Sequence, residues 1–221
     1  MTMMRAVEVK NLSVAYEGRS IITDFTFSVE AGETVLLKGS SGCGKSTFLH
    51  AVCGLIPGSI QAEISGEVLI YGKNILGLSV AERAREIGIV MQNPETQLFC
   101  GNVEDEIAFG LENLCIPKDE MSRRIDKMLG FTGLEQYRYI SPQELSGGQK
   151  QLVVLASVLA LDPKILLFDE ALSQLDSNGR EALIAQFQAL GREGRTLLFV
   201  EHDGQLESIS SRVVDLEVEW S

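Results

Sequence analysis

Residues 39–46 read Gly39-Ser40-Ser41-Gly42-Cys43-Gly44-Lys45-Ser46. This stretch fits the pattern GxxxxGK[ST], and it lies between a short β-rich run at 34–38 and a segment at 46–53 that favours helix. Glycines let the backbone wrap closely around a phosphate, so that amide N–H groups and the positive end of the helix face its oxygens. The order strand, loop, helix predicts an α/β core built around a phosphate-binding loop.

Three side chains at the end of this loop have distinct expected roles. Lys45 supplies a positive charge to the outer phosphates, Ser46 is a ligand for Mg²⁺, which prefers oxygen, and Thr47 donates to an inner phosphate. The alternative is a glycine-rich turn before a helix that carries a surface lysine. Cys43 has two interpretations: a thiol at a helix N-terminus reacts readily, whereas the motif tolerates many residues at this position.

Two carboxylates follow an apolar run further along the chain. Residues 165–168 read Ile-Leu-Leu-Phe and lead into Asp169 and Glu170. Such runs are typical of strands buried on both faces of a parallel sheet, and open α/β sheets place their ligands at the carboxyl ends of strands. We therefore predict that Asp169 holds the metal and that Glu170 orients or deprotonates an attacking water. Without the phosphate-binding loop, two acids after a strand would more often begin a solvated loop.

A second anion site is predicted at residues 145–149, which read Leu-Ser-Gly-Gly-Gln and open a helix expected at 146–160. Ser146 caps the helix and donates to an anion, while Gly147 and Gly148 let backbone N–H groups face a phosphate. An exact string of five residues arises by chance only about once in a few million positions. The alternative is an ordinary capped helix after a glycine turn.

The rest of the chain divides into a β-rich start, a helical middle and a return to buried strands. Alternating residues predict antiparallel strands at 7–16 and 25–29, joined by a turn at 17–20. Further strands are expected at 34–38, 67–71, 87–91, 165–168 and 196–200, and further helices at 103–114 and 121–129. The proline at 163 ends the helix at 146–160.

Composition narrows the classes of function. The 221 residues are 45% hydrophobic and carry a formal net charge of −12, which disfavours extended contact with nucleic acid or anionic lipid. The longest apolar run is far short of the roughly 20 residues that a membrane span needs, so no direct membrane insertion is expected. The start of the chain resembles no secretion signal, and the four cysteines form no CxxC pair, so reduced thiols in the cytoplasm are expected.

The five-residue string, followed by an apolar strand that ends in Asp-Glu, resembles the ABC ATPase family over essentially the whole chain. The resemblance implies a P-loop NTPase (RecA-like) core with an N-terminal antiparallel β-subdomain and an inserted α-helical subdomain at about 93–141 of a single domain spanning 1–221. It implies ATP and Mg²⁺ as cofactors and a dimer with a second ATPase subunit, identical or related, in which each ATP is shared between two subunits. The positions implied to bind ATP are Tyr16, Gly39, Ser40, Ser41, Gly42, Cys43, Gly44, Lys45, Ser46, Thr47, Ser146, Gly147, Gly148 and Gln149.

The resemblance assigns further roles one by one. Tyr16 matches the aromatic residue that stacks on adenine, although a strand tyrosine is often a core or surface residue. Gln92 matches the glutamine that approaches Mg²⁺ and water, and His202 the histidine that contacts the γ-phosphate, so the catalytic set is Glu170, His202, Gln92 and Lys45, and the metal set is Ser46, Gln92 and Asp169. Asp176 matches the acidic residue of the loop that links the two nucleotide sites.

Residues 92–99 (QNPETQLF) and 104–110 (EDEIAFG) resemble the energy-coupling factor branch, whose members power the import of vitamins or of transition-metal ions. A transmembrane coupling subunit is then implied to dock near Gln92 to Phe99, at the cytoplasmic face of the membrane, with Leu98 and Phe99 as interface residues. The alternative places both in the core of the helical lobe. Where the family usually has Pro-Thr after the glutamate, this chain has Ala171-Leu172, and it continues Ser173-Gln174-Leu175.

Other functions are also compatible with a phosphate-binding loop. A non-transport ABC ATPase acting on DNA or ribosomes usually carries coiled-coil insertions, basic surfaces or tandem ATPase halves, and none is visible here. A regulatory subunit that only binds nucleotide is disfavoured by intact Lys45, Glu170 and His202. A P-loop kinase gives no reason for the Leu-Ser-Gly-Gly-Gln string.

Overall fold

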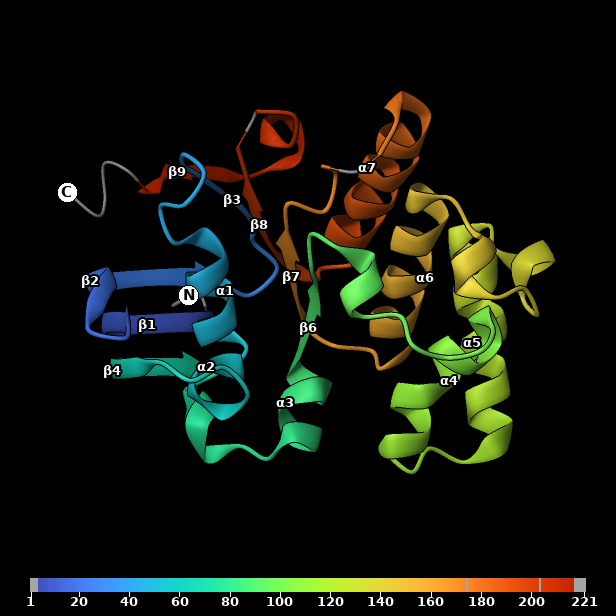
Figure 1. Cartoon of the computed structure of the whole chain (residues 1–221), viewed down its shortest axis with the longest axis horizontal. Coiled ribbons are helices and arrows are strands. Elements are labelled where there is room, and N and C mark those ends of the chain that lie inside the picture. Colours follow the sequence, from blue (N-terminus) through green and yellow to red (C-terminus); the bar gives the residue numbers. More distant parts are fainter. Residues whose placement is uncertain (1–3, 174, 203, 217–221) are drawn as a thin grey trace.

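The computed structural model describes residues 4–173, 175–202 and 204–216, so Gln174 lies outside the described residues. Two sheets and a group of helices lie side by side, with the parallel sheet in the middle (Figure 1).

The strands are β1 (Arg5–Tyr16), β2 (Arg19–Glu30), β3 (Thr34–Lys38), β4 (Glu63–Ile70), β5 (Lys73–Asn74), β6 (Ile87–Val90), β7 (Ile165–Asp169), β8 (Thr196–Glu201) and β9 (Arg212–Asp215). The α-helices are α1 (Lys45–Val52), α2 (Leu55–Gly58), α3 (Val80–Glu86), α4 (Val103–Asn113), α5 (Lys118–Thr132), α6 (Gly147–Ala160) and α7 (Ser177–Arg192). Short 3-10 turns occupy Ile75–Gly77, Pro94–Thr96, Glu135–Tyr137, Pro142–Glu144 and Glu207–Ile209.

The antiparallel sheet has the strand order β2-β1-β4-β5. Its first two strands form the predicted hairpin, in which Tyr16 pairs with Arg19. Only Glu17 and Gly18 make the turn, both with positive φ, as tight hairpins require. The predicted turn at 17–20 was therefore too long by two residues, because Arg19 and Ser20 already belong to β2.

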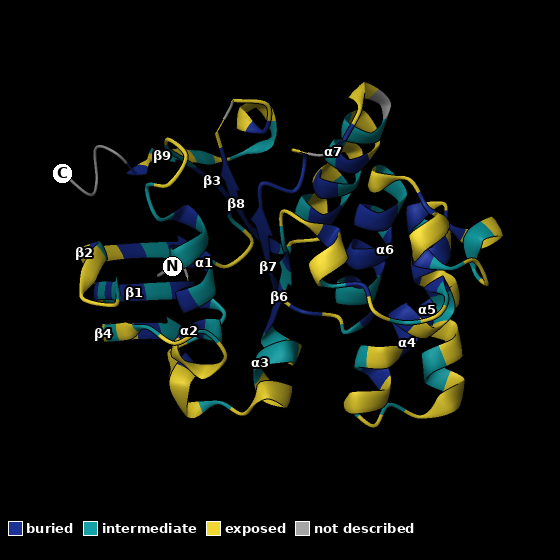
Figure 2. Ribbon diagram, in the orientation of Figure 1, coloured by how far each residue is buried: buried dark blue, intermediate teal, exposed yellow. Residues whose placement is uncertain are grey.

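The parallel sheet has the order β6-β7-β8-β3-β9, and each pair of neighbours is parallel. Leu36, Phe168 and Phe199 face one hydrophobic core, which includes α6 and α7. Alternate residues of the same strands, such as Leu37 and Leu167, face a second core against α1 and the antiparallel sheet. Burial on both faces explains why β7 and β8 are continuous apolar runs, and Figure 2 shows both strands buried throughout.

The helical part comprises α4, α5 and α6, which share one core that includes Leu111, Leu129 and Leu155. The helices predicted at 103–114, 121–129 and 146–160 are confirmed, with ends that differ by at most three residues. The chain thus has the predicted fold class of an antiparallel β-subdomain, a parallel phosphate-loop sheet and a helical subdomain. The limits of the subdomain at about 93–141 stay a prediction.

Helix α7 was missed by the sequence reading. Its buried residues Leu183, Phe187 and Leu190 recur at spacings of four and three residues, which is the helical pattern that would have revealed it. Strand β9 was missed too, since it is short and half-exposed and depends on pairing with β3 for its strand form. Within the described residues, no helix has the length and apolar character needed to cross a membrane.

Candidate active site

Strand register brings the predicted site residues to one edge of the parallel sheet. Val90 of β6 pairs with Phe168 of β7, which in turn pairs with Phe199 of β8, while Leu36 of β3 pairs with Phe199 from the other side. The carboxyl ends of the four strands are therefore level. Asp169 is the last residue of β7, and the phosphate-binding loop, Gln92, Glu170 and His202 follow the strand ends, as expected for a ligand site in an open α/β sheet.

The phosphate-binding loop is tightly wound. Gly44, the residue before α1, has φ of +104°, a conformation that side chains other than hydrogen rarely tolerate. A Cβ at Gly39 would lie 2.8 Å from Cys43 Sγ. Within this fully described stretch, no side chain caps the first amides of α1, so those amides suit an anion.

Lys45 is a buried cation whose ammonium turns back into the loop. Its Nζ donates to the carbonyl oxygens of Gly39 at 2.9 Å and Ser40 at 2.8 Å. It also lies 3.8 Å from Glu170 Oε1 and 3.3 Å from His202 Nδ1. Because a buried ammonium must be paired or hydrogen-bonded, these partners stabilise Lys45 at the position where phosphates are expected.

Glu170 is the centre of the cluster. Gln92 Nε2 donates to its Oε2 at 2.7 Å, and His202 Nε2 lies 2.5 Å from its Oε1. Since a carboxylate accepts, the proton of a neutral His202 belongs on Nε2, which leaves Nδ1 to accept from Lys45. The predicted catalytic set of Glu170, His202, Gln92 and Lys45 is thus one connected group.

The oxygen atoms expected to hold Mg²⁺ lie beside this group. Ser46 Oγ donates to Asp169 Oδ1 at 3.0 Å, so a hydroxyl and a carboxylate meet where the loop and β7 adjoin. Oxygen ligands of this kind, few in number and completed by phosphates and water, are what Mg²⁺ prefers. Gln92 donates through its nitrogen, and its amide oxygen is the atom suited to a cation. Among the described residues, no group of three or more His, Cys, Asp or Glu side chains forms a separate metal site.

The second predicted anion site lies at the start of α6, on the other side of β6 and β7 from α1 in Figure 1. Ser146 Oγ accepts from Gln149 N at 3.3 Å, and Gln149 Oε1 accepts from Ser146 N at 2.9 Å. Because the Ser146 oxygen is occupied as an acceptor, its exposed hydroxyl proton is the part left to donate outward. Gly147 and Gly148 follow in the first turn and line a cavity of about 350 Å³ between α6 and α7.

Other predicted residues lie outside the connected group of Glu170, His202, Gln92 and Lys45, and one of them, Asp176, lines the cavity beside Gly147 and Gly148. Tyr16 ends β1, half-buried against the core under the antiparallel sheet. Asp176 caps α7, where its Oδ1 accepts from Gly179 N at 2.8 Å. Ala171 and Leu172, where the family usually has Pro-Thr, are both buried. Cys43 is partly exposed and carries a free thiol.

The expected interface pair Leu98 and Phe99 divides between core and surface. Leu98 is 6% exposed and packs in the helical core, so its prediction as an interface residue is wrong in this structure. Phe99 is 64% exposed and meets Phe109 edge to face, with ring centroids 4.6 Å apart. The sequence reading missed Phe109 as a surface residue, because exposed and buried aromatic residues look alike in sequence.

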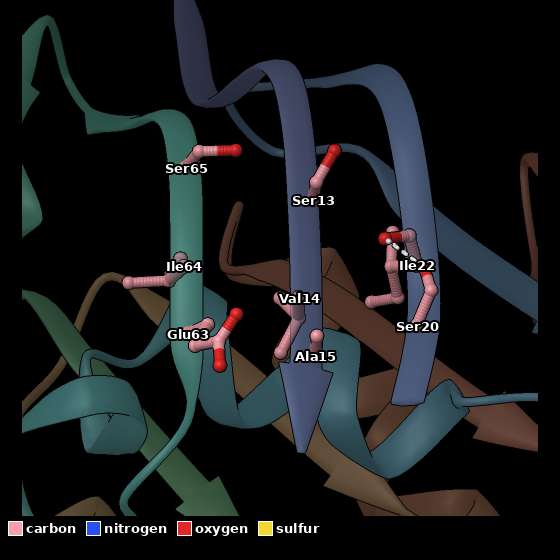
Figure 3. Close-up of a pocket in the computed structure, with 8 residues that line it drawn as sticks. All are labelled: Ser13, Val14, Ala15, Ser20, Ile22, Glu63, Ile64 and Ser65. Atoms are coloured by element: carbon pink, nitrogen blue, oxygen red, sulfur yellow. Dashed lines mark hydrogen bonds between the residues drawn. The ribbon is translucent and has the colours of Figure 1, made fainter. Parts of the chain in front are cut away.

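A separate depression of about 220 Å³ lies on the antiparallel sheet (Figure 3). Serine side chains of β1 and β4 and the carboxylate of Glu63 line it. None of the residues that line it belongs to the predicted site.

Comparisons with known proteins agree with this geometry. The family model described as ABC transporter matches residues 22–173. The chain is 38% identical over 215 residues to the energy-coupling factor transporter ATP-binding protein EcfA1 of Leuconostoc mesenteroides. This match covers 96% of this chain and 77% of that protein. It is 39% identical to a putative ABC transporter ATP-binding protein of Methanosarcina acetivorans, but spans only 34% of that longer protein.

Solved structures give the same result. With a TM-score of 0.78 and 30% identity, the chain resembles cbiO1 from Clostridium perfringens, part of the ABC transporter complex cbiONQ, over 90% of this chain and 79% of that one. With a TM-score of 0.83 and 26% identity, it resembles the dimeric ATP-binding cassette MJ0796 bound to ADP and Pi, over 95% and 93% of the two chains. The chain therefore belongs to the ABC transporter family and carries its ATP-binding, ATP-hydrolysing domain.

Proposed function

We propose that this chain is the ATP-hydrolysing subunit of an energy-coupling factor type importer for a vitamin or a transition-metal ion. The observation that carries ATP hydrolysis in this proposal is the connected group of Glu170, Gln92, His202 and Lys45 at the strand ends. The likeness to EcfA1 and to cbiO1 supports the branch. Relatives described only as putative ABC transporter ATP-binding proteins match about as well, so the branch rests on the segment around Gln92.

In this proposal the residues of the site divide the work of phosphoryl transfer. The loop at 39–47 and Lys45 bind and orient the triphosphate, and Glu170 takes a proton from the attacking water through a carboxylate oxygen. His202 contacts the γ-phosphate and keeps Glu170 in place. Ser46, Asp169 and Gln92 would hold Mg²⁺, which neutralises charge on the phosphate oxygens.

The proposed assembly is a dimer with a second ATPase subunit. Ser146, Gly147, Gly148 and Gln149 would contact the ATP held by the partner's phosphate-binding loop, since their own loop lies on the other side of β6 and β7. Tyr16 would stack on adenine, and Asp176 would lie near the second site. The dimeric state of the similar cassette MJ0796 supports this arrangement.

A transmembrane coupling subunit would dock near Gln92 to Phe99 and hold the chain at the cytoplasmic face of the membrane. The exposed pair Phe99 and Phe109 supports this location, because exposed aromatic residues are enriched at interfaces. Gln92 lies at one end of this segment and contacts Glu170. Docking would therefore act directly on the catalytic group.

The test uses Glu170→Gln and, as a matched control, Lys45→Ala. We expect Glu170→Gln to bind ATP and accumulate an ATP-bound dimer while hydrolysis falls at least about 100-fold, since a general base contributes about 10²–10⁴-fold. Lys45→Ala should instead weaken ATP binding. Phosphate release measures hydrolysis, calorimetry measures ATP binding, and size-exclusion chromatography with ATP measures the dimer.

If Glu170→Gln hydrolyses ATP at a rate near that of wild type, Glu170 does not take the proton from the attacking water. Wild-type protein that binds ATP without releasing phosphate would point to a regulatory subunit. Co-purification with a transmembrane protein separates an importer from an ATPase that acts elsewhere.

A further inference from the structure

Lys150 is a nearly buried cation directly after the Ser146–Gln149 turn. Its side chain is 11% exposed, and its Nζ donates to Glu95 Oε1 at 2.7 Å. The hydrogen bond from Lys150, followed by its charge, holds the pKa of Glu95 below its ordinary value. Burying an ammonium is unfavourable unless it is paired. Glu95, 55 residues earlier in the chain, supplies a carboxylate that pairs with this lysine.

The next residue of α6 makes a second tether. Gln151, which is 2% exposed, donates from Nε2 to the carbonyl oxygen of Met91 at 3.3 Å. Met91 and Glu95 lie on either side of Gln92, so α6 holds the backbone before Gln92 and a side chain after it. Gln97 strengthens the same turn, because its amide accepts from Met91 N and donates to the Ile89 carbonyl.

We propose that Lys150 and Glu95, with Gln151, are positioning residues that fix the loop of Gln92 to the serine-glycine turn at the start of α6. This inference rests on the proposed function, in which Gln92 serves the chain's own ATP and Ser146 serves the partner's ATP. A shift of Gln92 would then be passed to Ser146, since packed side chains and ion pairs are contacts that carry coupling between sites. The Lys150–Glu95 ion pair therefore connects the residue that serves the chain's own ATP with the residue that serves the partner's ATP.

The experiment compares Lys150→Met and Glu95→Gln with Lys164→Met, which removes the Lys164–Glu86 pair at 3.0 Å, away from the site. In the complex with which the chain co-purifies, we expect kcat for ATP to fall about 10-fold in the first two variants, since small misplacements cost up to about 100-fold. ATP affinity of the separate subunit should stay within about twofold, because the phosphate-binding loop is untouched. Lys164→Met should keep the wild-type kcat.

Two further variants separate positioning from folding. Lys150→Arg keeps the charge and should retain most activity, and the exchanged pair Glu95→Lys with Lys150→Glu should recover most of the kcat that each single change loses. An unchanged kcat in Lys150→Met, or no recovery in the exchanged pair, would overturn the inference.

Ser146→Arg distinguishes the two proposals. If this variant retains turnover, the proposed shared site itself is wrong. If it abolishes turnover while Lys150→Met does not, only the positioning role fails.

Discussion

At the scale of single residues, the buried ionisable groups are the ones that point to the candidate active site. Lys45 and Glu170 are both buried, and each contacts side chains that follow other strands: Lys45 lies near Glu170 and His202, and Glu170 accepts from Gln92. Glu170 also has a positive φ of 47°, which is uncommon for a residue with a side chain. Its amide donates to the Val200 carbonyl at 2.9 Å, so β8 holds the backbone in this conformation. A backbone conformation of this kind costs free energy, and such conformations are characteristic of functional positions.

His50 gives a prediction about pH. It lies one turn after Ser46 in α1, and burial lowers its pKa from 6.5, an effect that the charge of Asp169 partly opposes. The unfolded chain therefore binds this proton at a higher pH than the folded chain does. His50 favours the folded state fully above about pH 6.5, and this contribution is lost as pH falls through the lowered pKa.

We expect the free energy of unfolding to fall less steeply between pH 7.5 and pH 5.5 in His50→Gln than in wild type. Urea unfolding at several pH values measures the difference, and the carboxylates common to both proteins cancel in the comparison. Equal slopes for the two proteins would show that His50 keeps its ordinary pKa.

At the scale of elements, the start of α4 is built around a buried carboxylate. Glu106 is buried, and its Oε2 accepts from Phe99 N at 3.0 Å and Cys100 N at 2.7 Å. These two bonds fix the turn that keeps Leu98 inside and Phe99 outside. The segment before α4 is therefore shaped by a residue inside α4.

Glu106→Ala should destabilise the protein by about 1–3 kcal/mol, because the amides of Phe99 and Cys100, in two part-buried hydrogen bonds, lose their acceptor. Glu106→Gln is the matched control, since its amide oxygen still accepts and the loss should be smaller. Urea unfolding monitored by circular dichroism measures both. Equal losses in the two variants would show that the charge, and not the accepted hydrogen bonds, stabilises the turn.

At the scale of the whole molecule, the exposed Phe99–Phe109 pair is expected to join the chain to its membrane partner. Phe99→Asp should abolish co-purification with the transmembrane subunit, because a carboxylate at an apolar interface is desolvated without a partner. Folding should persist, since surface changes alter stability by about 0.5 kcal/mol or less. ATP binding by the separate chain should also be unchanged.

Val213→Asp is the control for this experiment. Val213 is also an exposed apolar residue, but it lies on β9, at the edge of the parallel sheet opposite to β6. Retention of the partner by Phe99→Asp, or its loss in both variants, would contradict docking at this pair.

The amino-acid sequence alone determined the local pieces of this protein. The phosphate-binding loop, the buried strand before Asp169 and the capped start of α6 were predictable, because each depends on residues close together in the chain. The roles of Gln92 and His202 needed the family resemblance as well, since Gln92 lies 78 residues from Glu170 and nothing local joins them.

Which side chains meet, and which face the solvent, depends on the folded arrangement of distant segments. The parallel register brings Glu170 to His202 and Gln92, and packing buries Leu98 while exposing its neighbour Phe99. The Lys150–Glu95 pair is likewise absent from any local pattern. The physical reason is that burial and pairing are set by contacts between distant segments, and those contacts exist only once the chain has folded.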